Sequence, residues 1–191
     1  MKAIAICGSP KKKGNTETLL VRCLERLSKE GFDTELICLR GKTIKSCIAC
    51  GVCGKKKDKS CAVKNDDFHD VFSSMLEADM MIVGSPVYFG SAAPQLMALL
   101  DRAGYVSRGN NHLFSRKIGG PIAVARRAGQ NFTCAQLLLW YMINDMIVPG
   151  STYWNIAFGW GPEEVLDDPE GLDTIDRFAD NLAWLAKKLI P

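Results

Sequence analysis

Short apolar segments alternate along this chain with longer segments in which apolar residues recur every three or four positions. The short segments predict β-strands at 2–7, 33–40, 78–86, 119–125 and 146–151. The longer segments predict amphipathic helices at 16–30, 66–78, 92–105, 132–146 and 171–189. Strands that alternate with helices are typical of a parallel sheet with helices on both faces. The pattern therefore predicts an α/β fold, a doubly wound five-stranded parallel sheet in a three-layer sandwich, with residues 1–191 as a single domain.

The first predicted helix has recognisable ends. Asn15 precedes its apolar face and is a candidate N-cap, because its side chain can accept a hydrogen bond from a free amide of the first turn. Gly31 follows the last turn, where glycine commonly ends a helix. The helix is therefore expected to begin and end at these two residues.

Composition and charge argue against a nucleic-acid-binding, secreted or membrane-spanning protein. The 191 residues include 24 lysines and arginines against 21 aspartates and glutamates, a net charge of +3 that is too small to predict binding to nucleic acid. The first residues, MKAIAICGSP, lack the pattern of a signal peptide, and no apolar window reaches the ~18 residues of a membrane span. We therefore expect a cytoplasmic protein that does not bind membranes.

The loop GSPKKKGNT (8–16) joins the first predicted strand to the first predicted helix. It matches neither the P-loop nor the dinucleotide fingerprint. It does combine two glycines, three lysines and the hydroxyls of Ser9 and Thr16, and it opens a helix whose N-terminal amides attract anions. By itself this pattern fits a phosphate-binding loop and an ordinary polar turn equally well.

Two further loops follow predicted strands at the same edge of the sheet, where doubly wound folds bind ligands. GSPVYFGS (84–91) places large apolar side chains there, which predicts either a wall for a flat ring or an aromatic patch packed on neighbouring chain. ARRAGQN (125–131) adds Gly129, which allows a tight turn, and two arginines that could contact an anion or remain solvated. Taken together, the three loops predict a phosphate and a planar ring, the two ends of flavin mononucleotide (FMN).

A cysteine-rich segment at about 41–65 contains four cysteines with the spacing C-x2-C-x2-C-x7-C. They are Cys47, Cys50, Cys53 and Cys61. Three cysteines at two-residue intervals followed by a fourth favour a [4Fe–4S] cluster, whereas zinc sites usually use two separated pairs. Zinc, disulfides and free thiols remain as alternatives. The other four cysteines, which we expect to pack as small apolar residues, are Cys7, Cys23, Cys38 and Cys134.

The segments GSPKKKGNT and SPVYFGSAAPQLMALLDR resemble the two signature segments of the flavodoxin-like NADPH-dependent FMN reductase family. With CIACGVC, the resemblance narrows to the iron–sulfur flavoproteins. It implies a flavodoxin-like fold, an FMN phosphate held by the first segment, and an FMN ring lined by the second. The expected FMN-binding residues are Ser9, Lys11, Gly14, Asn15, Thr16, Pro86, Val87, Tyr88, Phe89, Gly90 and Gly129. The expected ligands of the [4Fe–4S] cluster are Cys47, Cys50, Cys53 and Cys61.

The resulting functional hypothesis is a redox flavoprotein that transfers electrons between FMN, the cluster and an external carrier. No residue is expected to act as a catalytic acid or base. The alternatives are an NAD(P)H-dependent oxidoreductase for FMN, quinones or nitro compounds without a cluster, and a metal-stabilised binding module. The expected partners are a ferredoxin-like carrier or NAD(P)H, and the resemblance implies a homodimer or a tetramer. The lysines at 55–59 are either a solvated charge run or a docking patch for an acidic carrier, and the four tryptophans are expected in the core or at a subunit interface.

Overall fold

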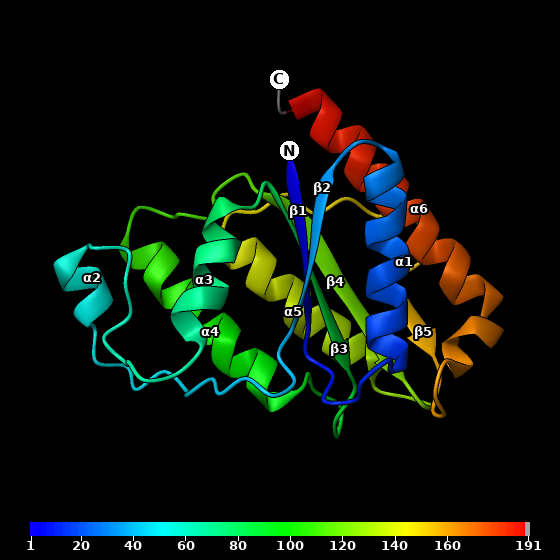
Figure 1. Ribbon diagram of the computed structural model, residues 1–191, viewed down its shortest axis with the longest axis horizontal. Helices are drawn as coiled ribbons and strands as arrows, with labels where there is room; N and C mark the ends of the chain where they lie inside the picture. The colour runs from blue at the N-terminus through cyan, green and yellow to red at the C-terminus, as the bar shows by residue number, and fades with distance from the viewer. Residues whose placement is uncertain (190–191) are drawn as a thin grey trace.

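The computed structural model describes residues 1–189 and contains one five-stranded parallel sheet (Figure 1). The strands are β1 (Lys2–Cys7), β2 (Asp33–Cys38), β3 (Met80–Pro86), β4 (Ile118–Ala125) and β5 (Ile156–Phe158). Their order in the sheet is β2-β1-β3-β4-β5, and every neighbouring pair is parallel. This is the flavodoxin-like order, in which the direction of winding switches between β1 and β3. The predicted fold class is confirmed.

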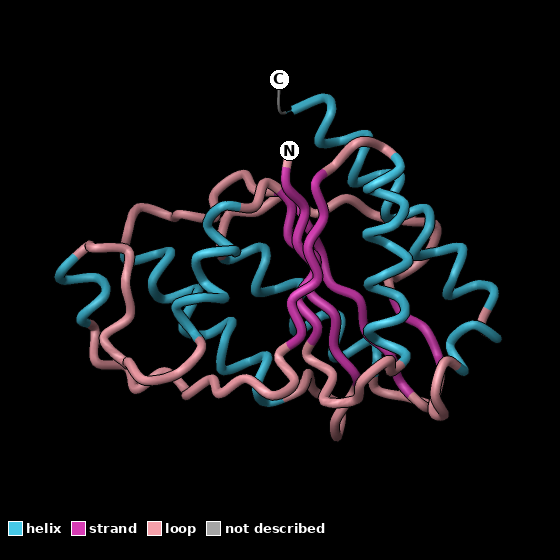
Figure 2. Tube along the Cα trace, viewed as in Figure 1, coloured by secondary structure: helices cyan, strands magenta, loops and turns pink. Residues whose placement is uncertain are grey.

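Helices cover both faces of the sheet and form the outer layers of the three-layer sandwich (Figure 2). They are α1 (Asn15–Lys29), α2 (Val52–Lys56), α3 (Phe68–Glu77), α4 (Pro94–Gly109), α5 (Gln130–Ile143), the 3-10 helix η1 (Glu164–Asp167) and α6 (Pro169–Leu189). One layer consists of α1 and α6, and the opposite layer contains α3, α4 and α5. Among residues 1–189, no helix has both the length and the apolar character needed to cross a bilayer.

The core lies on both sides of the sheet because successive strand residues point to opposite faces. In β1, Ile4 and Ile6 pack against the α3, α4 and α5 layer. Ala3 and Ala5 alternate with them and pack against the α1 and α6 layer. This alternation in a fully buried strand explains why its sequence reads as a continuous apolar run.

The fifth strand is not where the sequence pattern placed it, and the expectation of a strand at 146–151 was wrong. Ile147 makes a single parallel bridge to Ile118, and the pairing stops there. Pro149 has no amide to donate to a ladder, so the chain leaves the sheet. It rejoins the sheet at β5, whose first residue, Ile156, pairs with Ala123 of β4.

Two local features also differ from the sequence expectation. Gly14 rather than Asn15 is the N-cap of α1, in an extended conformation, and Asn15 is the first helical residue. The short helix α2 was not expected. It begins after Gly51 and ends before Lys57, both of which have the left-handed backbone conformation, and it lies at one end of the molecule, away from the sheet (Figure 1).

Candidate functional site

A cleft of about 150 Å³ opens at the carboxyl edge of the sheet. Four loops form it: the loop from β1 to α1, the loop after β3, the loop after β4, which contributes Arg126, and the loop after β5. Its lining residues are Ser9, Lys11, Lys12, Lys13, Gly14, Asn15, Thr16, Pro86, Val87, Tyr88, Val124, Arg126, Gly159, Trp160, Gly161 and Pro162. The structure therefore brings eight of the eleven predicted FMN-binding residues to one cleft, and their role in binding stays a prediction.

The loop from β1 to α1 presents the free amides of a helix N-terminus to the cleft. The first amides of a helix have no partner within the helix, and they favour a bound anion. The hydroxyl-bearing residues Ser9 and Thr16 are buried beside these amides, with 4% and 2% exposure. Glu17, the acidic residue of this turn, is already paired with Arg40 at 2.9 Å. The arrangement is suited to a dianionic phosphate.

Asn15 does not cap α1 as expected, and its side chain bonds to the loop after β5 instead. Its Nδ2 donates to the carbonyl oxygen of Gly161 at 3.0 Å, and its Oδ1 accepts from the amide of Val165 at 3.2 Å. Both ends of the side chain are therefore used to hold the loop after β5 against the start of α1. Asn15 shapes the cleft by fixing one of its walls.

Trp160 forms part of that wall and lies outside the core, with 61% of its surface exposed, and its place at a subunit interface, the other expected position, stays a prediction. The Nζ of Lys11 lies 5.2 Å from the indole centroid, and the guanidinium carbon of Arg126 lies 4.8 Å from it. The carboxylate of Glu164 accepts hydrogen bonds from the amides of Gly161 and Trp160, which lower the pKa of that carboxyl. Sequence reasoning missed this wall because it placed the fifth strand ten residues too early.

The loop after β3 has two parts with different surroundings. Pro86, Val87 and Tyr88 line the cleft. Tyr88 and Ser91 then close a tight turn through two backbone hydrogen bonds of 2.8 and 3.0 Å. At its tip Phe89 has a φ of 51° and is fully exposed, which is an unusual conformation for a bulky residue.

Three predicted residues lie outside the lining of the cleft. Phe89 borders a neighbouring hollow together with Tyr88 and Ser46, and Gly90 follows Phe89 as the third residue of the turn. Gly129 has a φ of 90°, and a Cβ there would come within 2.9 Å of the side chain of Val87. Glycine at this position therefore lets the loop after β4 approach the loop after β3.

A second hollow, of about 110 Å³, is lined by all four cysteines of the predicted cluster set. Tyr105, Val106 and Arg102 of α4 form its other side. No aspartate, glutamate or histidine lines it within the described residues, so its donors are thiols alone. Iron–sulfur clusters use such a donor set, and four-cysteine zinc sites use it as well.

The four sulfur atoms do not yet form a ligand shell. Within residues 1–189, no group of three or more histidine, cysteine or acidic side chains converges closely enough to hold a metal ion. Cys53 instead points its sulfur to the carbonyl oxygen of Tyr105 at 3.8 Å, and partial burial raises the pKa of its thiol. The residues fit a thiolate-bound group in their chemistry and in sharing one hollow, and a metal bound there stays a prediction.

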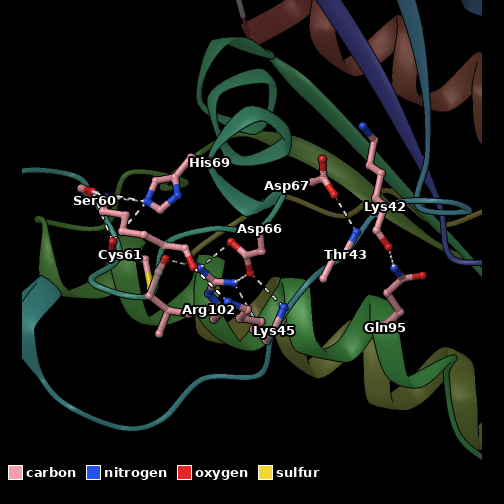
Figure 3. A network of polar contacts seen from close by, with 12 residues as sticks. Lys42, Thr43, Lys45, Ser60, Cys61, Asp66, Asp67, His69, Gln95 and Arg102 are labelled. Atoms are coloured by element: carbon pink, nitrogen blue, oxygen red, sulfur yellow. Dashed lines mark hydrogen bonds and ion pairs between the residues drawn. The ribbon is translucent and has the colours of Figure 1, made fainter.

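The chain around the cysteines is fastened at several points (Figure 3). The imidazole Nε2 of His69, from α3, lies 3.1 Å from the carbonyl oxygen of Cys61. At its base, Asp67 and Thr43 close the segment: the amide of Asp67 donates to the carbonyl of Thr43, and the amide of Thr43 donates to the carboxylate of Asp67. The segment therefore leaves and rejoins the domain at one place.

The other four cysteines lie apart from this hollow. Burial raises the pKa of Cys7 and of Cys23 to about 12, and it raises the pKa of Cys134 to about 11. Cys38 is partly buried, and burial raises its pKa as well. These thiols stay protonated at neutral pH, as expected of cysteines that pack as small apolar residues.

Known proteins resemble this chain over nearly its whole length. The profile of the NADPH-dependent FMN reductase family matches residues 1–161. An iron–sulfur flavoprotein of Methanocaldococcus jannaschii is 36% identical over 98% of each chain, and one of Methanosarcina thermophila is 33% identical over 95% of this chain and 93% of that protein. Among solved structures, a flavodoxin from the domain Archaea has a TM-score of 0.64 at 16% identity and covers 98% of this chain and 99% of its own.

Proposed function

The chain belongs to the NADPH-dependent FMN reductase family, and on that premise we propose that it is an electron-transfer flavoprotein with two redox centres. FMN binds in the cleft at the carboxyl edge of the sheet, and a [4Fe–4S] cluster is held by Cys47, Cys50, Cys53 and Cys61. The observation that carries the proposal is the presence of both sites in one chain, a cleft suited to a phosphate and an all-thiol hollow. The names of the iron–sulfur flavoproteins that it resembles support the same assignment.

Different residues are proposed to bind the phosphate and the ring of FMN. The amides at the start of α1, with Ser9 and Thr16, receive the phosphate. Tyr88 and Trp160, on opposite loops, provide aromatic walls for a ring. When bound, FMN exchanges electrons in pairs or singly and the cluster carries single electrons, while the protein supplies orientation and electrostatics.

The absorption spectrum of anaerobically purified protein tests this proposal. Flavin bands with a broad iron–sulfur shoulder would support it. Flavin bands alone would leave an NAD(P)H-dependent oxidoreductase for FMN, quinones or nitro compounds. Neither signal would leave only a binding module, and both redox assignments would fail.

The first prediction concerns the phosphate site. Replacing Thr16 with valine removes a buried hydroxyl from the lining of the cleft while conserving its shape. A hydrogen bond to a charged group contributes about 1.5–3 kcal/mol, so FMN binding should weaken by roughly 10- to 100-fold. The measurement is fluorescence titration of flavin-free protein with FMN, after chromatography has identified the flavin released from the purified protein.

Thr18→Val is the matched control. Thr18 lies in the same turn, but its hydroxyl donates to the carbonyl of Gly14 at 3.3 Å and does not line the cleft. It should bind FMN as the unmodified protein does. Equal affinity in both variants, or the release of FAD instead of FMN, would contradict the assignment of this loop to an FMN phosphate.

The second prediction concerns the external partner. The helix α2 and the residues after it carry four exposed lysines beside the cysteine hollow. They are Lys55, Lys56, Lys57 and Lys59. Opposite charge speeds encounter and is screened over ~10 Å at 0.1 M salt. Reversing Lys55, Lys56 and Lys57 to glutamate should slow electron exchange with a ferredoxin at least tenfold at low salt and flatten its salt dependence, as followed by stopped-flow absorbance.

The control reverses two exposed lysines at the distant ends of α1 and α6, Lys29 and Lys188. This double variant lowers the net charge but leaves α2 unchanged, so it should exchange electrons nearly as fast as the unmodified protein. If the α2 variant and the control behave alike at low salt, the lysines of α2 are a solvated charge run and NAD(P)H becomes the favoured partner.

We also propose self-association, in a dimer or a tetramer. The outer surface of α5 exposes four large apolar residues, and Tyr105 of α4 and Phe89 of the turn are exposed as well. The residues of α5 are Phe132, Leu139, Met142 and Ile143. Exposed apolar side chains gathered on one element are typical of interfaces, and sedimentation velocity would detect the assembly. The cytoplasm is the compartment that we propose, because none of the eight cysteines is paired in a disulfide.

A further inference from the structure

Arg102, near the middle of α4, is a buried arginine beside the cysteine hollow. Its side chain and that of its ion-pair partner, Asp66, are both 0% exposed. Arginine is rarely buried to this extent unless its guanidinium is paired with an opposite charge and hydrogen-bonded. The partners of this guanidinium therefore indicate why it is there.

The two terminal nitrogens of Arg102 bind both arms of the cysteine segment. Nη1 donates to the carbonyl oxygen of Lys45 at 3.1 Å and to the carboxylate of Asp66, and Nη2 donates to the carbonyl oxygen of Val63 at 2.9 Å. Asp66 in turn accepts from the amide of Lys45 at 2.9 Å. Lys45 lies two residues before Cys47, and Val63 lies two residues after Cys61. One side chain of α4 thus holds the entry and the exit of the ligand segment together.

One N–H group of the guanidinium remains unused. The Nε of Arg102 is buried and has no hydrogen-bond partner within residues 1–189. The ring of Phe68 lies over the guanidinium, 3.9 Å from its central carbon, and offers a π-face but no acceptor for Nε. Buried donors are nearly always paired in native proteins. Arg102 also lines the cysteine hollow, so this unpaired donor is available to an acceptor bound there.

We propose that Arg102 is the positioning residue of the cysteine centre, which ties both arms of the segment to α4 and keeps its Nε–H for a sulfur atom of the bound group. The inference rests on the proposed function, because the acceptor is a cysteine or cluster sulfur. Hydrogen bonds to these sulfurs raise the reduction potential of iron–sulfur centres, since a donor favours the more negative, reduced state. Arg102 therefore sets both the shape of the ligand segment and the ease with which the centre accepts an electron.

The experiment compares Arg102→Lys with Arg108→Lys in anaerobically purified protein. Arg108 lies on the same helix but is exposed and bonds only to the carbonyl of Ile143 among the described residues. In Arg102→Lys the charge is conserved, while the fork that reaches both arms and the Nε–H are lost. We expect amide hydrogen exchange over residues 44–66 to become at least tenfold faster. We also expect the reduced centre to lose about tenfold in relative stability, a fall of about 59 mV in its midpoint potential.

A second variant guards against misfolding. Arg102→Met together with Asp66→Leu replaces the buried pair with apolar side chains, a change that proteins often tolerate because no lone charge is left inside. It should show the same faster exchange and the same lower potential. Exchange and potential unchanged in both variants would overturn the inference. Faster exchange with an unchanged potential would overturn the role of Nε and reduce Arg102 to a structural tie.

If the proposed function is wrong, the measurements give a result that differs from the failure of the Arg102 inference. Unmodified protein without iron would remove the cysteine centre itself, and no midpoint potential could be measured for any variant. The exchange measurement does not need the cluster and would still decide whether Arg102 ties the two arms together.

Discussion

Serine at any one of Cys47, Cys50, Cys53 or Cys61 is expected to remove most of the iron from the protein and to bleach the iron–sulfur absorption. The four thiols line one hollow and no other metal-binding side chain lines it among the described residues, so no substitute ligand is at hand. A hydroxyl is also a poor replacement for a thiolate at iron. Iron per chain and the visible spectrum, both measured after anaerobic purification, are the readouts.

The FMN content separates this loss from general unfolding. The cleft shares no lining residue with the cysteine hollow, so the serine variants should retain their flavin. Cys134→Ser is the matched control, because Cys134 is a half-buried cysteine that lines neither site. It should retain both cofactors. Zinc in place of iron in the unmodified protein would overturn the cluster assignment.

The second large effect is expected on stability. Replacing Asp66 with alanine leaves the guanidinium of Arg102 inside the protein without its counter-charge. Removing one partner of a buried ion pair costs about 3–5 kcal/mol, so the free energy of unfolding should fall by that amount at pH 7. Urea unfolding, followed by circular dichroism, is the measurement.

The pH dependence of this loss has a definite sign. Burial acts to raise the pKa of Asp66, but the hydrogen bonds from Arg102 and from the amide of Lys45 outweigh it and hold the pKa below its ordinary value. A carboxyl with a lowered folded-state pKa stabilises the protein above its unfolded-state pKa of about 3.9. That stabilisation is lost as the pH falls through the folded-state pKa. The difference between the unmodified protein and Asp66→Ala should therefore shrink in acid.

Glu30→Ala provides the matched control for ion-pair removal. Glu30 pairs with Lys187 at 2.6 Å, but both side chains are about half exposed, at 50% and 48%. Exposed pairs contribute little because water screens them, so this variant should unfold almost as the unmodified protein does. A similar loss in the two variants would mean that water reaches Arg102 and that the burial of the pair has no energetic consequence.

Much of the fold follows from local patterns in the sequence. The sequence predicts β1 and β3 from the apolar runs at 2–7 and 78–86, because a strand buried on both faces is apolar at every position. It predicts α1 from Leu20, Leu24 and Leu27, because a helix buried on one face has apolar residues every three or four positions. The fifth strand could not be found in this way. The run at 146–151 begins with three apolar residues, but Pro149 interrupts its pairing, and the three residues of β5 are too few to show a period.

The residues of the candidate sites also differ in whether local sequence patterns could predict them. Residues on the loops after β1 and β3 could be predicted, since each loop directly follows a recognisable strand. Trp160 could not, because its place in the cleft depends on where β5 ends and on the bonds that Asn15 makes with Gly161 and Val165, 146 and 150 residues away along the chain. Arg102 was equally hidden. Its partners lie 36 to 57 residues earlier in the sequence, and only the folded chain brings them together.

The closure of the cysteine segment by Thr43 and Asp67 makes residues 44–66 a detachable unit. Its two ends are joined by a pair of hydrogen bonds, so a short turn could bridge them without moving β2 or α3, much as surface insertions are gained and lost between homologues. The excision would expose Arg102 to water, which solvates its charge readily, and it would also remove the bonds that Asn110 makes with Lys59 and Cys53. The same geometry describes a graft in the opposite direction. A flavodoxin-like scaffold that accepts this segment, together with an arginine on the facing helix, would acquire the four cysteines and the residue that we propose to position them.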